Sequence, residues 1–260
     1  FDGINDNIEI FDCIYGEDED ECTDPTLFDS DGDNVDDGLE INTYTSNPLV
    51  TDTDEDGFVD NEDDCDLVSG TSTNDRQGCP DTDSDGWSDP DEGWTTNNGA
   101  DAFPTQPSQW IDSDNDGFGD NIDGFEPDHC PYRRGYSTSD RFGCLDSDGD
   151  SWSDADPGGL DGIEPWFAHP TGTADAFPFV ESQWNDTDED GFGDNWADGS
   201  WNDTRMNWSI GMWYSNASYP DACPFITGNS VEDRYGCPDT DNDCLLYTSD
   251  AADEEDSVDL

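Results

Sequence analysis

Residues 112–121 read DSDNDGFGDN, and residues 186–195 read DTDEDGFGDN. Both decapeptides place aspartate at positions 1, 3, 5 and 9, glycine at position 6 and phenylalanine at position 7. The pattern D-x-D-x-D-G-[aromatic]-x-D, with small departures, starts six times along the 260-residue chain. Such internal repetition predicts a repeat protein rather than one globular core. The six loops are named by their first residues (loop 29, loop 52 and so on), which are Asp29, Asp52, Asp81, Asp112, Asp146 and Asp186.

The spacing of the acids is that of a calcium loop of the EF-hand type. Calcium is a hard cation that takes about six to eight oxygen ligands, so carboxylates at positions 1, 3 and 5 can converge on one ion as the chain curls. Position 6 needs a sharp turn that glycine tolerates. Position 7 offers its carbonyl, and position 9 binds directly or through water. The predicted ligands at positions 1, 3, 5, 7 and 9 are Asp29, Asp31, Asp33, Val35 and Asp37; Asp52, Asp54, Asp56, Phe58 and Asp60; Asp81, Asp83, Asp85, Trp87 and Asp89; Asp112, Asp114, Asp116, Phe118 and Asp120; Asp146, Asp148, Asp150, Trp152 and Asp154; and Asp186, Asp188, Asp190, Phe192 and Asp194.

Position 12 of such loops usually carries a bidentate acid. Pro157 and Ala197 occupy it in the last two loops, which predicts weaker sites there or a ligand from Asp156, Asp161 or Asp198. The first four loops carry the acids Glu40, Asp63, Glu92 and Asp123 at this position. Asp239, Asp241 and Asp243 begin a further, incomplete loop.

Proline or glycine follows position 9 in several loops, as at Gly38, Pro90 and Pro157. These residues are poor continuations of a helix, and no stretch shows apolar residues at helical spacing. We therefore expect turns between the loops, with short strands at most around residues 58–60, 118–120 and 192–194. The predicted fold class is an irregular, calcium- and disulfide-stabilised tandem repeat array with little regular secondary structure.

Composition supports a fold without a large apolar core. The chain has 69 acidic and 6 basic residues, and its formal net charge is −63. This charge excludes a nucleic-acid partner, because phosphate contacts need Lys and Arg, and it opposes docking on an anionic membrane. Leu, Ile, Val and Phe make up only 39 residues. However, 10 Trp, 9 Cys and acids at fixed spacings do not fit a disordered acidic tail.

The cysteines form a second repeated pattern, C-x13-C, which occurs three times. Each segment has glycine five residues after the first cysteine, an Asp-Arg pair, and glycine just before the second cysteine. A bridge that closes a loop of about 15 residues contributes roughly 3 kcal/mol. Bridges between neighbouring segments remain an alternative, and any such bridges imply an oxidising compartment. The predicted local pairs are Cys13–Cys22, Cys65–Cys79, Cys130–Cys144 and Cys223–Cys237.

The loops and the nearby Cys-Pro pairs resemble thrombospondin type 3 repeats and similar aspartate-rich repeats of microbial surface proteins. The resemblance covers residues 1–243 and includes Cys79-Pro80, Cys130-Pro131, Cys223-Pro224 and Cys237-Pro238. It implies calcium cores wrapped by irregular chain, more than one ion per repeat, and a role at the cell surface or in a matrix. The repeated D-A-F-P…Q-W insert departs from the animal pattern. This departure favours a microbial surface protein.

The segment from Trp196 to Pro220 is an aromatic insertion. The preferred interpretation is a glycosylated surface loop whose rings pack on the repeats, and the alternative is a surface that binds a glycan or a protein partner. Arg76, Arg141 and Arg234 each follow an aspartate within a cysteine segment, where we expect them to clamp carboxylates. The glycosylation candidates are Asn185, Asn202, Asn207 and Asn216.

The predicted organisation follows the motifs in chain order. A truncated loop with Cys13 and Cys22 spans residues 1–28, and a segment that resembles a translated sequencing adapter, and is expected to be non-native, spans residues 244–260. The segments between them are 29–64 with two loops, 65–143 with a cysteine segment and two loops, 144–222 with two loops and the insertion, and 223–243 with a cysteine segment and a truncated loop.

The predicted function is that of an extracellular or cell-surface calcium-binding structural or adhesive protein, a stiff acidic spacer. We expect several calcium ions, an extracellular protein or glycan as partner, and no membrane insertion of this segment. Two histidines, with neither a phosphate-binding loop nor a nucleophile elbow, give no support for an enzyme. The alternatives are a non-catalytic calcium-binding appendage of a secreted hydrolase and an acidic surface that binds mineral or buffers calcium.

Overall fold

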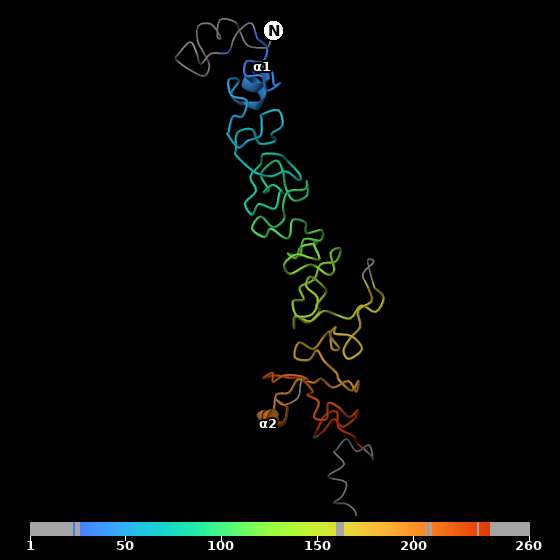
Figure 1. The fold of residues 1–260 in the computed structure, drawn as a ribbon. Helices are drawn as coiled ribbons and strands as arrows, with labels where there is room; N and C mark the ends of the chain where they lie inside the picture. The colour runs from blue at the N-terminus through green and yellow to red at the C-terminus, as the bar shows by residue number, and fades with distance from the viewer. Residues whose placement is uncertain are drawn as a thin grey trace, which may run out of the picture. The chain divides into compact units, whose positions relative to one another are not determined.

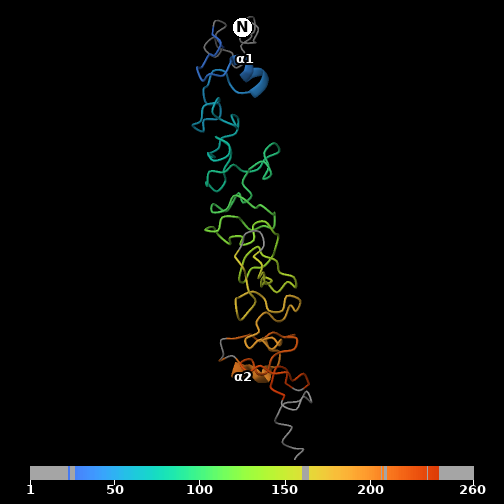
Figure 2. The same ribbon diagram turned by 90° about the vertical axis from the view of Figure 1, so that its right-hand side faces the viewer.

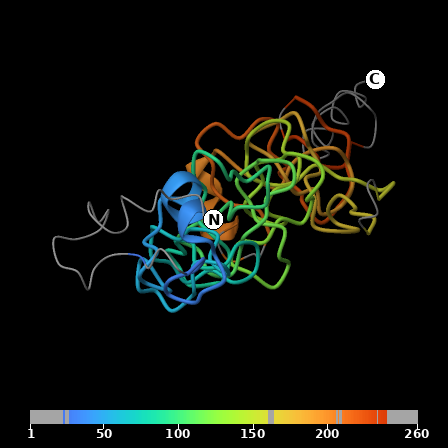
Figure 3. The same cartoon turned by 90° about the horizontal axis from the view of Figure 1, so that it is seen from above.

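The described part of the chain is almost entirely irregular. Among the described residues, helical turns are confined to α1 (Asp37–Leu39), the π-helical η2 (Glu40–Tyr44), the 3-10 turn η4 (Gly199–Trp201) and α2 (Asn202–Arg205). The remaining described chain forms loops without strands. The coiled ribbons of α1 and α2 are visible in Figure 1, Figure 2 and Figure 3. This confirms the expectation of little regular secondary structure. The computed structural model describes residues 23, 27–159, 164–205, 207, 210–232 and 234–239.

One expectation about the connections is wrong. A turn was expected at Gly38, yet this residue lies inside α1. The Asp36 side chain caps the helix by accepting a 3.0 Å hydrogen bond from the Gly38 amide, and the Glu40 amide donates to the Asp36 carbonyl. A capping aspartate of this kind satisfies an amide that would otherwise lack a partner at the helix start. Two of the suggested strands are reduced to isolated bridges at Gly119 and Gly193, and residues 58–60 form neither a strand nor a bridge.

The chain divides into two compact units. One unit comprises Phe1–Ile111 with Asp123–Phe125, and the other comprises Asp112–Ile122 with Glu126–Leu260. Within each unit the loops close on themselves through backbone hydrogen bonds. In loop 81, for example, the Asp89 amide donates to the Pro80 carbonyl at 2.7 Å. Equivalent bonds close loops 29, 52, 146 and 186 at distances of 2.7–3.2 Å.

The interior of the described chain is small and largely polar. Its buried apolar side chains are the second cysteine of each bridge, Ala100, Ala174, Trp184, Trp196, Pro48 and Pro224. Buried carboxylates are more numerous than these, and Asp37, Glu40, Asp101, Asp175, Asp194 and Asp221 are each at most 1 % exposed. Apolar burial alone therefore does not account for the way these segments pack.

Among the described residues, three disulfides close short segments of the chain. The structure forms the predicted bridges Cys65–Cys79, Cys130–Cys144 and Cys223–Cys237, with Cα–Cα distances of 5.0, 5.1 and 5.1 Å. The segments 65–79, 130–144 and 223–237 are called staples below. The predicted pair Cys13–Cys22 lies outside the described residues. Disulfides of this kind are typical of an oxidising environment.

Candidate metal centres

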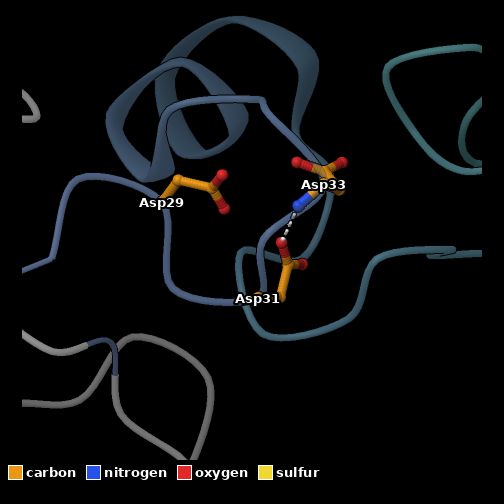
Figure 4. A group of neighbouring side chains, drawn as sticks. All are labelled: Asp29, Asp31 and Asp33. Atoms are coloured by element: carbon orange, nitrogen blue, oxygen red, sulfur yellow. Dashed lines mark hydrogen bonds between the residues drawn. The ribbon is translucent and has the colours of Figure 1, made fainter.

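Loop 29 shows how the chain curls around its own carboxylates. Asp29 accepts hydrogen bonds from the amides of Gly32 and Asn34 at 2.6 and 3.0 Å. Asp31 accepts one from the Asp33 amide at 3.2 Å, and this pair is drawn in Figure 4. Asp33 in turn accepts from the amide at position 7 at 2.7 Å. The three side chains come from one turn of the chain (Figure 4), and one oxygen of each lies within 4.8 Å of the others.

The same hydrogen bonds recur in the other loops. Position 1 accepts from the amide at position 6 at 2.9–3.0 Å in every described loop. Position 5 accepts from the amide at position 7 at 2.7–3.0 Å. These short-range bonds bring the carboxylates at positions 1, 3 and 5 to one side of each loop.

Two positions of each loop adopt left-handed backbone. The sequence predicted this conformation at position 6, where φ is between 76° and 104° in all six loops. The structure adds position 4, where φ is between 61° and 87°. Asn34 and Ser151 replace glycine at position 6, and in those two loops position 4 is Gly32 or Gly149. Each loop therefore has glycine at one of its two left-handed positions, which limits the strain on the other.

The oxygens at positions 1, 3 and 5 lie close enough together to share an ion. In each triplet, one oxygen from every residue lies within 4.8 Å of the others. Two oxygens that bind one calcium ion at about 2.3–2.6 Å are separated by at most about 5 Å. The geometry therefore fits a single metal ion. Such triplets include Asp29, Asp31 and Asp33; Asp52, Asp54 and Asp56; Asp81, Asp83 and Asp85; and Asp112, Asp114 and Asp116.

Many of these carboxylates have a buried oxygen without a hydrogen-bond partner in the described chain. An isolated buried polar atom is costly, and native structures leave few of them. Their recurrence at positions 3 and 5 points to a common missing partner, and a cation is the partner that suits carboxylate oxygens. The residues at these positions with such an oxygen are Asp31, Asp33, Asp54, Asp83, Asp85, Asp114, Asp148, Asp150 and Asp188.

A further carboxylate completes each group from outside positions 1–9. We call it the distal carboxylate, and in the last five loops it is an aspartate whose carboxylate accepts the amide of the residue two positions later. That residue is cysteine after Asp63, Asp128 and Asp221, with distances of 2.7, 2.6 and 2.7 Å. It is phenylalanine after Asp101 and Asp175, with 2.7 Å in both cases. In loop order from loop 29, the distal carboxylates are Glu40, Asp63, Asp101, Asp128, Asp175 and Asp221.

Each distal carboxylate lies close enough to the aspartates of its loop to be repelled by them. Burial, reinforced by repulsion from the loop aspartates, raises the pKa of these carboxyls well above the ordinary value. Asp101, for instance, is raised first by burial and then by Asp85 and Asp83. The pKa is raised to about 6 for Asp63, about 7 for Asp101 and Asp128, and about 8 for Glu40, Asp175 and Asp221. A cation at the centre of the group would favour the ionised forms instead.

The distal carboxylates match the predicted position 12 only in loops 29 and 52. Glu92 and Asp123, predicted for loops 81 and 112, are exposed, whereas Asp101 and Asp128 are buried beside the loop acids. Of the substitutes considered for the last two loops, Asp156 is half-buried and Asp198 caps η4; Asp161 lies outside the described residues. The structure instead brings Asp175 and Asp221 to these loops. The recurring D-x-C and D-x-F tripeptides could have identified all four.

Position 9 has a structural role that the sequence reasoning missed. In all six loops its carboxylate accepts a hydrogen bond from the hydroxyl at position 2, which is always serine or threonine. In loop 52, for example, Thr53 donates both its amide and its hydroxyl to Asp60 at 2.7 Å. The conserved type at position 2 within this one chain was the available signal. Asp194 still has a buried oxygen without a hydrogen-bond partner in the described chain.

Each staple packs on the loop that precedes it. The amides of Gly70, Gly135 and Gly228 donate to the position-5 carboxylates of loops 52, 112 and 186 at 2.8, 2.9 and 3.0 Å. The glycine before the second cysteine leaves room for the distal carboxylate, because a Cβ at Gly143 would lie 2.2 Å from Asp128 Oδ1. A Cβ at the equivalent Gly78 or Gly236 would approach Asp63 or Asp221 as closely, at 2.1 and 2.2 Å.

Loops 81 and 146 use the D-A-F-P…Q-W insert in place of a following staple. Trp87 at position 7 stacks on Trp110, with ring centroids 6.1 Å apart, and Trp152 stacks on Trp184 at 6.2 Å. The Asp101 amide donates to the Ser88 carbonyl at 2.9 Å, which seats the distal carboxylate on loop 81. The insert is thus a second means of bringing a buried carboxylate to a loop.

Two of the predicted clamp arginines, Arg76 and Arg141, make local contacts in the structure. Arg76 forms a 2.7 Å ion pair with Asp91 through one nitrogen and lies over the Trp94 ring. Arg76 thus contacts a carboxylate as expected, but through a single nitrogen. Arg141 packs over Trp166 at 4.7 Å and donates to the carbonyl of His129.

The aromatic insertion packs partly on the repeats. Trp196 is buried, and Arg205 lies over its ring at 5.4 Å. Asn202 is a predicted glycosylation site, yet its side-chain oxygen accepts a 2.8 Å hydrogen bond from Trp196 Nε1. Asn207 and Asn216 are exposed, whereas Asn185 is half-buried.

Comparisons with known proteins add no assignment. No protein-family model and no curated protein sequence matches this chain. Across the described ranges, the structure contains no helix with the length and apolar character needed to cross a membrane. The resemblance to thrombospondin type 3 repeats therefore remains an expectation based on the motifs.

Proposed function

We propose that this chain is an extracellular calcium-binding structural protein, in which ions held by the aspartate loops take the place of an apolar core. The observation that carries the proposal is the set of buried carboxylate oxygens without hydrogen-bond partners at positions 3 and 5 and on the distal residue. Asp83, Asp85 and Asp101 illustrate it in loop 81. A folded chain with these groups ionised needs a positive charge at their centre.

Calcium is the ion that best suits these groups. The ligands are carboxylate oxygens, which hard cations prefer, and the cysteines near the loops are consumed in disulfides. Magnesium usually keeps several waters and uses one or two carboxylates, whereas each loop here gathers at least four. Extracellular calcium modules bind at about 10⁻⁴–10⁻³ M, so extracellular calcium would fill such sites and cytosolic calcium would not.

The proposed role is that of a stiff, acidic spacer or adhesive stalk without catalytic activity. Each loop is tied to the next segment through its distal carboxylate, so filled sites would fix the course of the chain. The strongly negative surface favours a soluble, extended element that presents other segments. This role agrees with the resemblance to thrombospondin type 3 repeats, and a microbial cell surface is the proposed location.

A pair of substitutions near loop 81 tests the proposal. Asp101→Asn removes the charge of a distal carboxylate that is 1 % exposed, and Glu92→Gln removes that of the exposed acid at position 12. Equilibrium dialysis with ⁴⁵Ca²⁺ should show the unmodified chain binding several ions and Asp101→Asn binding one fewer at submillimolar calcium. Glu92→Gln should bind as the unmodified chain does. Absence of calcium binding by the unmodified oxidised chain would contradict the proposal.

A further inference from the structure

The junction between loop 29 and loop 52 differs from the later ones. Staples lie between loops 52 and 81 and between loops 112 and 146, but residues 41–51 contain no cysteine. Instead, one oxygen each of Asp33, Glu40 and Asp60 lie within 4.8 Å of one another. Asp33 is position 5 of loop 29, Glu40 begins η2, and Asp60 is position 9 of loop 52. Carboxylates from two consecutive loops therefore meet at one point.

Two of these carboxylates are buried with an oxygen still free of hydrogen bonds. Glu40 is 0 % exposed; its Oε1 accepts a 3.3 Å hydrogen bond from Ser46, and its Oε2 has no partner in the described chain. Asp33 is 4 % exposed, and its Oδ2 also lacks such a partner. Three acids this close repel one another strongly unless an opposite charge lies between them. We propose that a divalent cation, separate from the ion of loop 29, binds between Asp33, Glu40 and Asp60 and joins loop 29 to loop 52.

This bridging site, which rests on the proposed calcium function, is compatible with the ions of both loops. Asp33 belongs to the triplet of loop 29 as well, so its two oxygens can serve two neighbouring ions. Both Asp60 oxygens accept hydrogen bonds from Thr53 at 2.7 Å, and each keeps a second lone pair. Ser46 and Asp60 also line a cavity of about 500 Å³, which leaves room for waters that complete the coordination of the ion.

The bridge would do at this junction what a staple does after loops 52 and 112. A staple holds the distal carboxylate that precedes it through the amide of its first cysteine, and it fixes the chain that leads to the next loop. Here Glu40, at the start of η2, would bind the bridging ion together with Asp60 of loop 52. The two loops should therefore order together rather than independently as calcium rises.

Hydrogen exchange of the full oxidised chain, measured during a Ca²⁺ titration, tests this coupling. The readouts are the calcium midpoints for protection of the amides of residues 29–37 and of residues 52–60. Asp60→Asn should shift the midpoint of loop 29, and Glu40→Gln that of loop 52, each to higher calcium by at least about fivefold. The matched control is Asp89→Asn, which changes position 9 of loop 81, where threonine makes the same contacts at 3.2 and 2.5 Å. It should leave both midpoints unchanged.

The outcomes separate the bridge from the general proposal. If Asp60→Asn changes only loop 52 and Glu40→Gln changes only loop 29, each loop binds its own ion and the bridge is overturned. If calcium protects neither loop in the unmodified chain, the calcium proposal itself is overturned, and the bridge with it.

Discussion

The Gly135 amide donates a 2.9 Å hydrogen bond to the carboxylate of Asp116, so the staple 130–144 rests directly on position 5 of loop 112. The same staple begins just after Asp128, the distal carboxylate of that loop. The disulfide-closed segment thus contacts two carboxylates: the Gly135 amide donates to the position-5 carboxylate, and the Cys130 amide donates to the distal carboxylate at 2.6 Å. Because the contact is repeated at loops 52 and 186, disulfide formation and metal binding should be coupled at three places along the chain.

Removal of one staple should weaken one loop selectively. The double variant Cys130→Ser/Cys144→Ser lacks the bridge that restricts residues 130–144. A bridge of this span stabilises the folded chain by about 3 kcal/mol. Hydrogen exchange of residues 112–120 should then require at least about tenfold more calcium for protection, whereas residues 52–60 should be unaffected. Equal shifts in both loops, or none in loop 112, would show that the staples do not act locally.

The glycine before the second cysteine offers a sharper test of the distal carboxylate. Gly143 and Gly149 have φ of 72° and 87°, but a Cβ at Gly149 meets nothing within 4 Å, whereas one at Gly143 collides with Asp128. Both alanine variants carry a similar backbone penalty, on the order of 1–2 kcal/mol. Gly143→Ala should additionally lose calcium affinity at loop 112 by about tenfold or more. Indistinguishable calcium titrations of the two variants would argue against Asp128 as a ligand.

The hydroxyl at position 2 should contribute measurably to loop stability. Thr82 donates its hydroxyl to Asp89 at 2.5 Å, and Thr82→Val removes this bond while keeping a side chain of similar shape. A hydrogen bond to a charged acceptor contributes about 1.5–3 kcal/mol. Urea unfolding in calcium should therefore show a loss of roughly that size for Thr82→Val and almost none for Val at the exposed Thr96. Similar stabilities of the two variants would show that the hydrogen bond from position 2 to position 9 does not stabilise the loop.

Without calcium, acid should stabilise the chain. Burial and neighbouring carboxylates raise the pKa of Asp101 to about 7 and that of Asp175 to about 8, whereas such groups titrate near about 4 in an unfolded chain. Between about pH 4 and 8, the folded chain therefore binds more protons than the unfolded chain does, and its stability falls as the pH rises.

Calcium should reverse this trend, because it binds the ionised carboxylates and its affinity grows as protons leave. Urea unfolding at pH 5 and pH 8 measures how the free energy of unfolding depends on pH. The measurement is made once on metal-free protein and once after calcium is added. Greater stability of the metal-free chain at pH 8 than at pH 5 would contradict the burial of these acids.

Local sequence predicts the convergence of positions 1, 3 and 5 in each loop but not which residue is the distal carboxylate. Positions 1, 3 and 5 converge because their hydrogen bonds span only a few residues, and the three C-x13-C bridges are similarly local. Asp101 and Asp175 come from far beyond position 12, on the insert that stacks Trp110 or Trp184 against the loop. Their role depends on packing, which spacing within one loop does not reveal. The short α1 was missed because the cap at Asp36 outweighs the low helix propensity of Gly38.

Small-angle X-ray scattering of the oxidised chain in millimolar calcium and in EDTA tests the central claim most directly. If ions held by the loops replace an apolar core, chelation leaves the clustered carboxylates to repel one another, and the radius of gyration should increase. Binding of calcium without any change in the scattering profile would contradict this account and would favour an acidic surface that buffers calcium or binds mineral.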